Sequence, residues 1–168
     1  HANNSILEFV PPGMAASMLV IPADRYGKMK RPLLRLTDAM SGEPIILAAA
    51  MVQAVIPLEP AEQQALPGAT GKILTGIMQE DEQGNIGAAL YVVSDDLELM
   101  QDGMHYAGQD LVILPSFNQA GEACRMQINP HQISHILPSP PELQEKNIKA
   151  VLGLGNGIQL PLGCGVVE

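Results

Sequence analysis

The sequence predicts a mainly β protein made of two related, small barrel-like (SH3-like) units from an internal duplication, with only short helices. Three observations support this prediction: short apolar runs, turn residues between them at intervals of about eight to twelve positions, and an internal repeat. The 168 residues include 16 Gly and 14 Pro, which break helix interiors and exclude a long helical bundle. Hydrophobic residues make up 46% of the chain, so a core can be buried.

The first region, residues 1–32, is expected to hold two strands followed by a basic segment. Residues 5–22 form two short apolar runs that are separated by Pro11, Pro12 and Gly13. Proline and glycine together mark a turn, so we expect a strand, a turn and a second strand here.

The first β repeat is placed at residues 33–104 and the second at residues 105–168. Each copy has an apolar strand, a polar turn that ends in Gly-Glu, and a second strand. Eleven positions then align without a gap, after two extra residues in the second copy that fit a longer hairpin or a bulge. The matching positions are Leu47, Val52, Val55, Ile56 and Pro57 in the first copy, and Ile128, Ile133, Ile136, Leu137 and Pro138 in the second.

Downstream of this block the two copies are more loosely similar. The first continues with GKILTG at 71–76 and ALYVVSDDLELM at 89–100, and the second with IKAVLGLGNGIQLPLG at 148–163. Helical segments are expected only at residues 60–66 and after Ser94, Asp95 and Asp96, whose side chains suit a helix N-terminus. Neither helix is expected to exceed about two turns.

Residues 33–100, and more faintly 111–168, resemble the small flagellar FlbD-type β domain. The resemblance rests on the order LLRLTD, turn, GEPIIL, the block ending MVQAVIPLE, GKILTG and YVVSDDLELM, with Asp95 where that family usually has an acid. The insertion around Glu80, Asp81 and Glu82 departs from the short hairpin of the family. The resemblance carries no catalytic motif and implies a compact β unit with an accessory, protein-binding role.

The charge balance argues against polyanionic partners. Nine Lys and Arg against eighteen Asp and Glu give a formal net charge of −9, which repels phosphate backbones and anionic lipid. Two Phe, three Tyr and no Trp leave few aromatic rings to stack on bases. We therefore expect neither a nucleic acid nor a membrane as partner. The sequence has no run of about 18 apolar residues, so no membrane span is predicted.

Five of the nine basic residues lie within eleven positions that contain no acid. Such a cluster on an acidic protein is a candidate site for an anionic ligand, an acidic partner or the acidic surface of a sister subunit. The alternative is a solvated connecting segment. The residues of this basic cluster are Arg25, Lys28, Lys30, Arg31 and Arg35.

The two cysteines and the N-terminus bear on the compartment. Cys124 and Cys164 are too far apart in sequence, and too few, for a zinc signature. A disulfide is open if their strands are neighbours, but two thiols in a reducing cytosol are the more ordinary arrangement. HANNSILEF lacks the basic and apolar regions of a signal peptide. We expect a cytoplasmic or particle-associated protein, with an earlier, already removed signal peptide as the alternative.

His131 and His135 are the strongest metal candidates, because a spacing of four places both rings on one face of a helix or of a strand. Gln132 stands where a zinc protease has its catalytic Glu, Pro130 disfavours a long helix, and no third ligand is near in sequence. The first copy has Ala50 and Ala54 at the matching positions. We therefore predict no metal and no other cofactor.

Four further motifs have ordinary structural interpretations. Residues 102–106 contain an Asp and a His, the combination that a general base would use. The Asp102-Gly103 pair favours an exposed linker with a turn instead. Ser94 reads as a helix cap because no nucleophile elbow occurs. Gly153 to Gly157 reads as a hairpin turn because no helix follows to bind phosphate. Glu80 to Glu82 reads as a solvated loop because calcium-loop spacing is missing.

Two functions follow from these observations. The preferred one is a non-enzymatic protein-binding or assembly module, a structural or accessory component of a bacterial or phage assembly that binds a protein partner or its own copies. Its surface of few charges and many Met and Ala suits packing against other subunits. The alternative is a small enzyme, or a small-molecule or metal binder, with its site between the two repeats; the polar groups of that site would be Asp102, His105, Cys124, His131 and His135.

Overall fold

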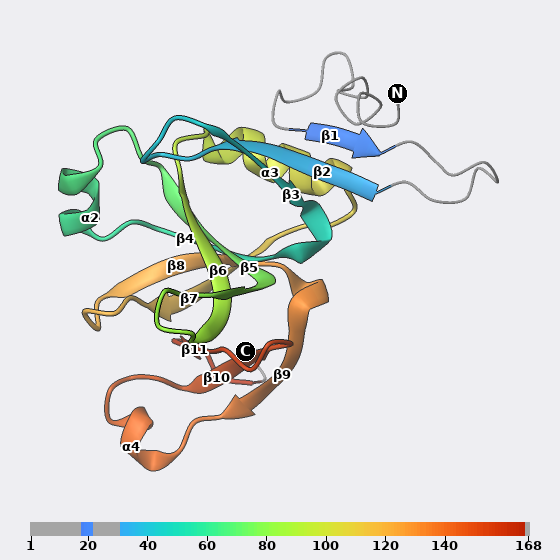
Figure 1. The fold of residues 1–168 in the computed structure, drawn as a ribbon. Helices are drawn as coiled ribbons and strands as arrows, with labels where there is room; N and C mark the ends of the chain where they lie inside the picture. The colour runs from blue at the N-terminus through green and yellow to red at the C-terminus, as the bar shows by residue number, and fades with distance from the viewer. Residues whose placement is uncertain (1–17, 22–30, 167–168) are drawn as a thin grey trace.

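The computed structural model describes residues 18–21 and 31–166, with side chains from residue 32 onward. It confirms a mainly β protein with few, short helices (Figure 1). Of the strand pair expected at residues 5–22, only β1 (Met18–Ile21) is described, and it pairs antiparallel with β2. The rest of that prediction lies outside the described residues.

The elements follow the same order in both halves of the chain: two strands, a short 3₁₀ helix, a strand, a short α-helix and two strands. In the first half they are β2 (Arg31–Thr37), β3 (Pro44–Ala48), η1 (Ala49–Met51), β4 (Val52–Ile56), α2 (Pro60–Ala65), β5 (Gly71–Glu80) and β6 (Ile86–Val93). In the second half they are β7 (Val112–Phe117), β8 (Ala123–Ile128), η2 (Pro130–Gln132), β9 (Ile133–Pro138), α4 (Pro141–Gln144), β10 (Ala150–Leu154) and β11 (Gln159–Leu162), and α3 (Leu97–Tyr106) joins the halves. We call the strands β2–β6 the first unit and β7–β11 the second.

The predicted barrel-like units do not form closed barrels in the described residues. The strands form a three-stranded sheet, β1-β2-β3, and an eight-stranded sheet, β6-β5-β4-β8-β7-β11-β10-β9. The eight-stranded sheet crosses from one unit to the other where β4 pairs antiparallel with β8, Ala54 opposite Ile128 and Val55 opposite Gln127. The edge of β4 is therefore used to join the two units rather than to close one of them.

The turns within the first hairpin of each unit form as the Gly-Glu pairs predict. Gly42 and Gly121 both have positive φ, at 75° and 81°. This left-handed conformation costs a glycine little, whereas a side chain would be strained there. The hairpin predicted at Gly155 to Gly157 also forms, between β10 and β11.

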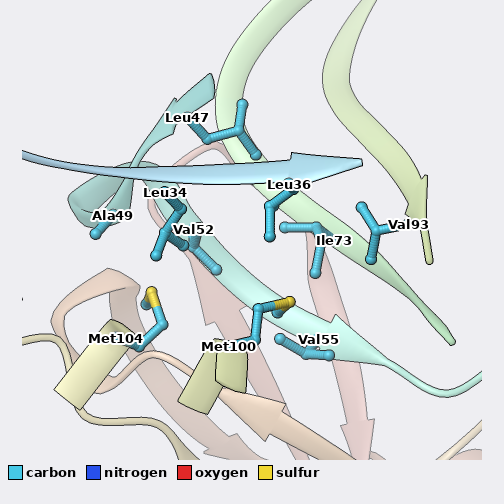
Figure 2. Packing of buried hydrophobic residues seen from close by; sticks show 10 residues of the cluster. All are labelled: Leu34, Leu36, Leu47, Ala49, Val52, Val55, Ile73, Val93, Met100 and Met104. Atoms are coloured by element: carbon cyan, nitrogen blue, oxygen red, sulfur yellow. The ribbon is translucent and has the colours of Figure 1, made fainter. Parts of the chain in front are cut away.

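Two hydrophobic clusters lie on opposite faces of β4 and β5. The first cluster gathers residues of β2, β3, β4, β5, β6 and α3, among them Leu34, Leu36, Val52, Ile73 and Met100 (Figure 2). The second is built mainly from β8, β10 and β11 but also takes Ala54 and Leu74 from the first unit. Four of the five residues of β4 are buried, as expected for a strand covered on both faces.

Helix α3 is longer than predicted, and it replaces the expected linker at Asp102 to Tyr106. Its ten residues begin after Asp96, whose Oδ1 accepts a hydrogen bond from the Glu98 N–H at 2.8 Å. Met100 and Met104 are buried four residues apart on one helical face and point toward the strands of the first cluster (Figure 2). Burial of this apolar face extends the helix through Gly103, where local sequence indicates a turn.

Candidate functional site

A cavity of about 360 Å³ lies between the two units, which is where the sequence-based alternative places a site. Its walls come from the end of β4 and the residues that lead into α2, from β5 and β6, from β7, β8 and their turn, and from β11 and the residue before it. Most of the wall is apolar and comprises Ile56, Leu74, Leu90, Phe117, Met126, Ile158 and Leu160. We call it the inter-unit cavity.

The alternation of β4 and β5 places the wall residues of the first unit. Ile56 and Leu74 lie on the faces of these strands that pack against the second cluster, whereas Val55 and Ile73 belong to the first cluster. Successive side chains of a strand point to opposite faces. One face of β4 and β5 therefore packs in the first cluster, and the other face contributes to the second cluster and to the cavity wall. The outer wall is Leu90 of β6, which remains half exposed.

An ion pair stands at one side of the cavity. Nζ of Lys72, largely buried on β5, lies 3.0 Å from Oε1 of Glu62 in α2. The pKa of Glu62 is lowered, chiefly because its carboxylate accepts a hydrogen bond from the Glu59 backbone N–H; Lys72 lowers it further and burial opposes the shift. The wall of the cavity therefore includes the Lys72 ammonium group, and the Glu62 carboxylate balances its charge.

Glu59 connects the two units at the cavity rim. It is the N-cap of α2, where it forms a capping box with Glu62. Its Oε1 also accepts a hydrogen bond from the backbone N–H of Gln119, in the β7–β8 turn, at 3.1 Å. This contact spans sixty positions of sequence and holds one wall of the cavity in place.

A second, open hollow at the junction is lined by side-chain amides. Nδ2 of Asn156 donates to Oε1 of the buried Gln53 at 3.1 Å, and Nε2 of Gln53 donates to Oε1 of Gln132 at 3.4 Å. Gln132 in turn donates to the Ala50 carbonyl. These neutral groups satisfy one another, so they join the units more readily than they perform acid–base chemistry.

The chain was compared with known families and proteins. Comparisons with protein-family models, with curated proteins and with solved structures find no match.

The basic cluster lies largely outside the described residues. Arg25, Lys28 and Lys30 are not among the described residues, and Arg31 is the first residue of β2, with no described side chain. Arg35 lies exposed on β2, opposite Ile46 of β3. The proposed role of this cluster stays a prediction.

His131 and His135 lie on different elements, η2 and β9. His135 pairs with Gly153 of β10, and its ring occupies the space above that glycine. Among the described residues no group of three or more His, Cys, Asp or Glu side chains could hold a metal ion. The ring of His135 thus has a packing role that the sequence pattern did not indicate.

His105 is paired, but with a residue that the sequence analysis missed. Its Nδ1 contacts Oδ1 of Asp110, five positions further on, and both side chains are exposed. The hydrogen bond and the charge of Asp110 raise the pKa of His105, and the charge of Asp102 adds to this effect. Because both side chains are exposed, this is a surface contact, and it is an ion pair when His105 is protonated.

Cys124 and Cys164 are free thiols. Cys124 of β8 pairs with Ser116 of β7, and Ser116 pairs in turn with Leu162 of β11, just before Cys164. Burial raises the pKa of Cys124, which disfavours the reactive thiolate. The intervening strand β7 separates the two thiols. They are free, as predicted, but half-buried where buried thiols were expected.

None of the five polar residues of the alternative lines the inter-unit cavity, although they were expected to converge between the units. Residues that do line it, such as Lys72, Glu59 and Phe117, were not singled out from the sequence. No sequence signal marks them, because each comes from a different element and Phe117 belongs to the other unit. Within the described chain, no helix is long and apolar enough to cross a membrane.

Proposed function

We propose that the protein is a non-enzymatic protein-binding and assembly module whose inter-unit cavity receives an apolar side chain of a partner protein. The observation that carries this proposal is the apolar wall of the cavity beside a charge-balanced ion pair. Such a cavity removes apolar surface from water on binding, which is the main favourable term in protein association.

The position of the exposed apolar residues supports a protein partner. Leu90 of β6 lies half exposed at the cavity mouth, and Ile86 of the same strand is also exposed. β6 is an outer strand of the eight-stranded sheet in the part of the chain that the structure describes. An extended partner segment could place one apolar side chain in the cavity while it runs along this edge.

The internal duplication and the FlbD-type resemblance belong to this proposal. The repeated order of elements supports the duplication, and the order of β2 to β6 follows the segments on which the resemblance rests. An accessory, protein-binding role in a bacterial or phage assembly fits both, in the cytoplasm or on a particle. The basic cluster would then bind an acidic surface of a partner or of a sister subunit.

The experiment selects peptides from a random displayed library with the folded protein, the Leu90→Asp variant and the Ile113→Asp variant. Wild type should enrich peptides that share an aliphatic or aromatic residue, and Leu90→Asp should reduce their binding at least tenfold. Ile113→Asp, at an exposed position of β7 that lies outside both the cavity and the β6 edge, should bind them as wild type does. No enrichment, or binding that survives Leu90→Asp, would contradict the proposal.

The alternative of a small-molecule binder is favoured by one observation, the cavity volume. About 360 Å³ lies near the lower end of the range of small-ligand pockets, roughly 300–1,000 Å³. A fragment screen by NMR distinguishes the two functions. Shifts confined to Leu74, Phe117 and Leu160 by a drug-sized compound, with no selected peptide, would favour the alternative.

A further inference from the structure

The two units have the same internal strand order. In the first unit, β3 pairs with β2, the end of β2 meets β6 through the Asp38–Val93 bridge, and β6 is followed by β5 and β4. In the second unit, β8 is followed by β7, β11, β10 and β9. In this order β3 and β4 stand at the two ends of the first unit, and their counterparts β8 and β9 stand at the two ends of the second.

The units are joined head to tail. β4, at one end of the first unit, pairs with β8, at the opposite end of the second. A contact of this kind leaves one half of the same interface unused at each end of the molecule. Among the described strands the unused halves are β9, the counterpart of β4, and β3, the counterpart of β8, which lie in the lower and upper parts of the molecule (Figure 1).

We propose that β9 of one copy pairs with β3 of the next copy and so repeats, between molecules, the β4–β8 junction within the chain. The partner is thus a second copy of this chain. The register of the internal junction, Ala54 opposite Ile128, places His135 opposite Leu47 and Ile136 opposite Ile46. The inference rests on the assembly part of the proposed function and specifies which strands of two copies pair.

The side chains at both edges support this pairing. At the internal junction Ile56 packs against the second cluster, whereas its counterpart on β9, Leu137, is 54% exposed. Ile46 on β3 is 43% exposed. Outer strands are commonly protected from pairing by charged residues, yet neither PIILA nor ISHILP contains a Lys, Arg, Asp or Glu.

The junction between molecules should be weaker than the one within the chain. Asn129 donates to the Val52 carbonyl and Gln132 to the Ala50 carbonyl at the internal junction. The counterparts of these two residues in the first unit are Ala48 and Met51, which offer no side-chain amide. Assembly should therefore depend on protein concentration rather than be permanent.

The test measures mass against concentration by size exclusion with light scattering. Wild type should grow beyond 17.9 kDa as concentration rises. Ile46→Lys and Leu137→Lys should each raise the dissociation constant at least tenfold. Leu99→Lys on α3 and Ile113→Lys on the inner strand β7 are matched controls, since those side chains are 45% and 54% exposed, and they should assemble as wild type does.

A mixture of the two edge variants distinguishes the head-to-tail contact from a two-fold one. Each variant keeps one intact edge, so an equal mixture should form a heterodimer and nothing larger. A two-fold contact between like edges would instead leave one variant dimeric by itself, which would overturn the proposal.

Failure of this inference can be told apart from failure of the proposed function. An oligomer that persists in both edge variants would overturn the edge pairing and keep the assembly function. A wild type that is monomeric at every concentration would overturn the edge pairing, whereas the peptide selection on the inter-unit cavity judges partner binding separately.

Discussion

The imidazole of His135 lies over Gly153, its cross-strand partner on β10, so closely that a Cβ at position 153 would overlap the ring. In the first unit the corresponding pair is Ala54 opposite Leu74. The large and the small side chain have exchanged strands between the two units. This exchange explains why the second unit has a histidine where the first has an alanine.

The first prediction concerns this pair. Gly153→Ala should lower the free energy of unfolding by about 1–3 kcal/mol, because the new methyl group overlaps the His135 ring. Urea denaturation measures the loss. In a His135→Ala background the same change should cost markedly less, as a double-mutant cycle would show.

Gly155→Ala is the matched control, since a Cβ there meets nothing within 4 Å. It should change stability by less than about 0.5 kcal/mol. An equal cost at positions 153 and 155 would mean that the histidine ring does not occupy the space above Gly153.

The second prediction concerns Asn129, a buried amide at the junction of the units. Its Nδ2 donates to the Val52 carbonyl at 2.9 Å and to Oε1 of Gln109 at 3.0 Å. Asn129→Ala should destabilise the protein by about 1–3 kcal/mol, because a buried carbonyl loses its donor. Thermal and urea unfolding check this, with exposed Gln79→Ala expected to stay within about 0.5 kcal/mol.

The third prediction concerns the N-cap of α3. Asp96→Ala removes the acceptor of the Glu98 N–H and should cost about 1 kcal/mol. Hydrogen exchange should quicken at the first turn of the helix. Asp102→Ala, within the same helix and exposed, is the control and should leave that turn protected; equal effects would argue against the cap.

The fourth prediction is a pH dependence. The pKa of His105 is raised by Asp110, so NMR titration should place it above 6.5, and Asp110→Asn should lower it. Because the pKa is higher in the folded state, the stabilisation is fully present below the unfolded value and is lost as pH rises through the folded one. The difference in stability between wild type and Asp110→Asn should therefore shrink on the alkaline side; a difference that grows there would contradict the assignment.

Local features of the fold could be predicted from the sequence because their causes are local. The glycines of the two polar turns, the cap before α3 and the Gly155–Gly157 hairpin each depend on a few neighbouring residues. Helix α3 was underestimated because its length depends on burial of Met100 and Met104 against strands that are distant in sequence. Of the His105–Asp110 pair at the end of that helix, only His105 was singled out from the sequence.

The sequence predicted where a site would lie, between the two repeats, but not which residues would line it. Its lining residues are ordinary aliphatic side chains and carry no spacing that a motif could match. The polar residues chosen instead stand out chemically, but hydrogen bonding and packing disperse them: His105 to Asp110, and His135 to Gly153.

The sequence by itself determined the mainly β class, the positions of the described turns, and the repeated order of elements, since each follows from residue type and short-range periodicity. Only the tertiary structure decided that the units share one open sheet through β4 and β8. The five residues VQAVI are suited to a buried strand but do not specify a partner, because hydrogen bonds of the backbone are the same for every sequence. The partner is chosen by which distant faces can be buried together, and that choice created the inter-unit cavity.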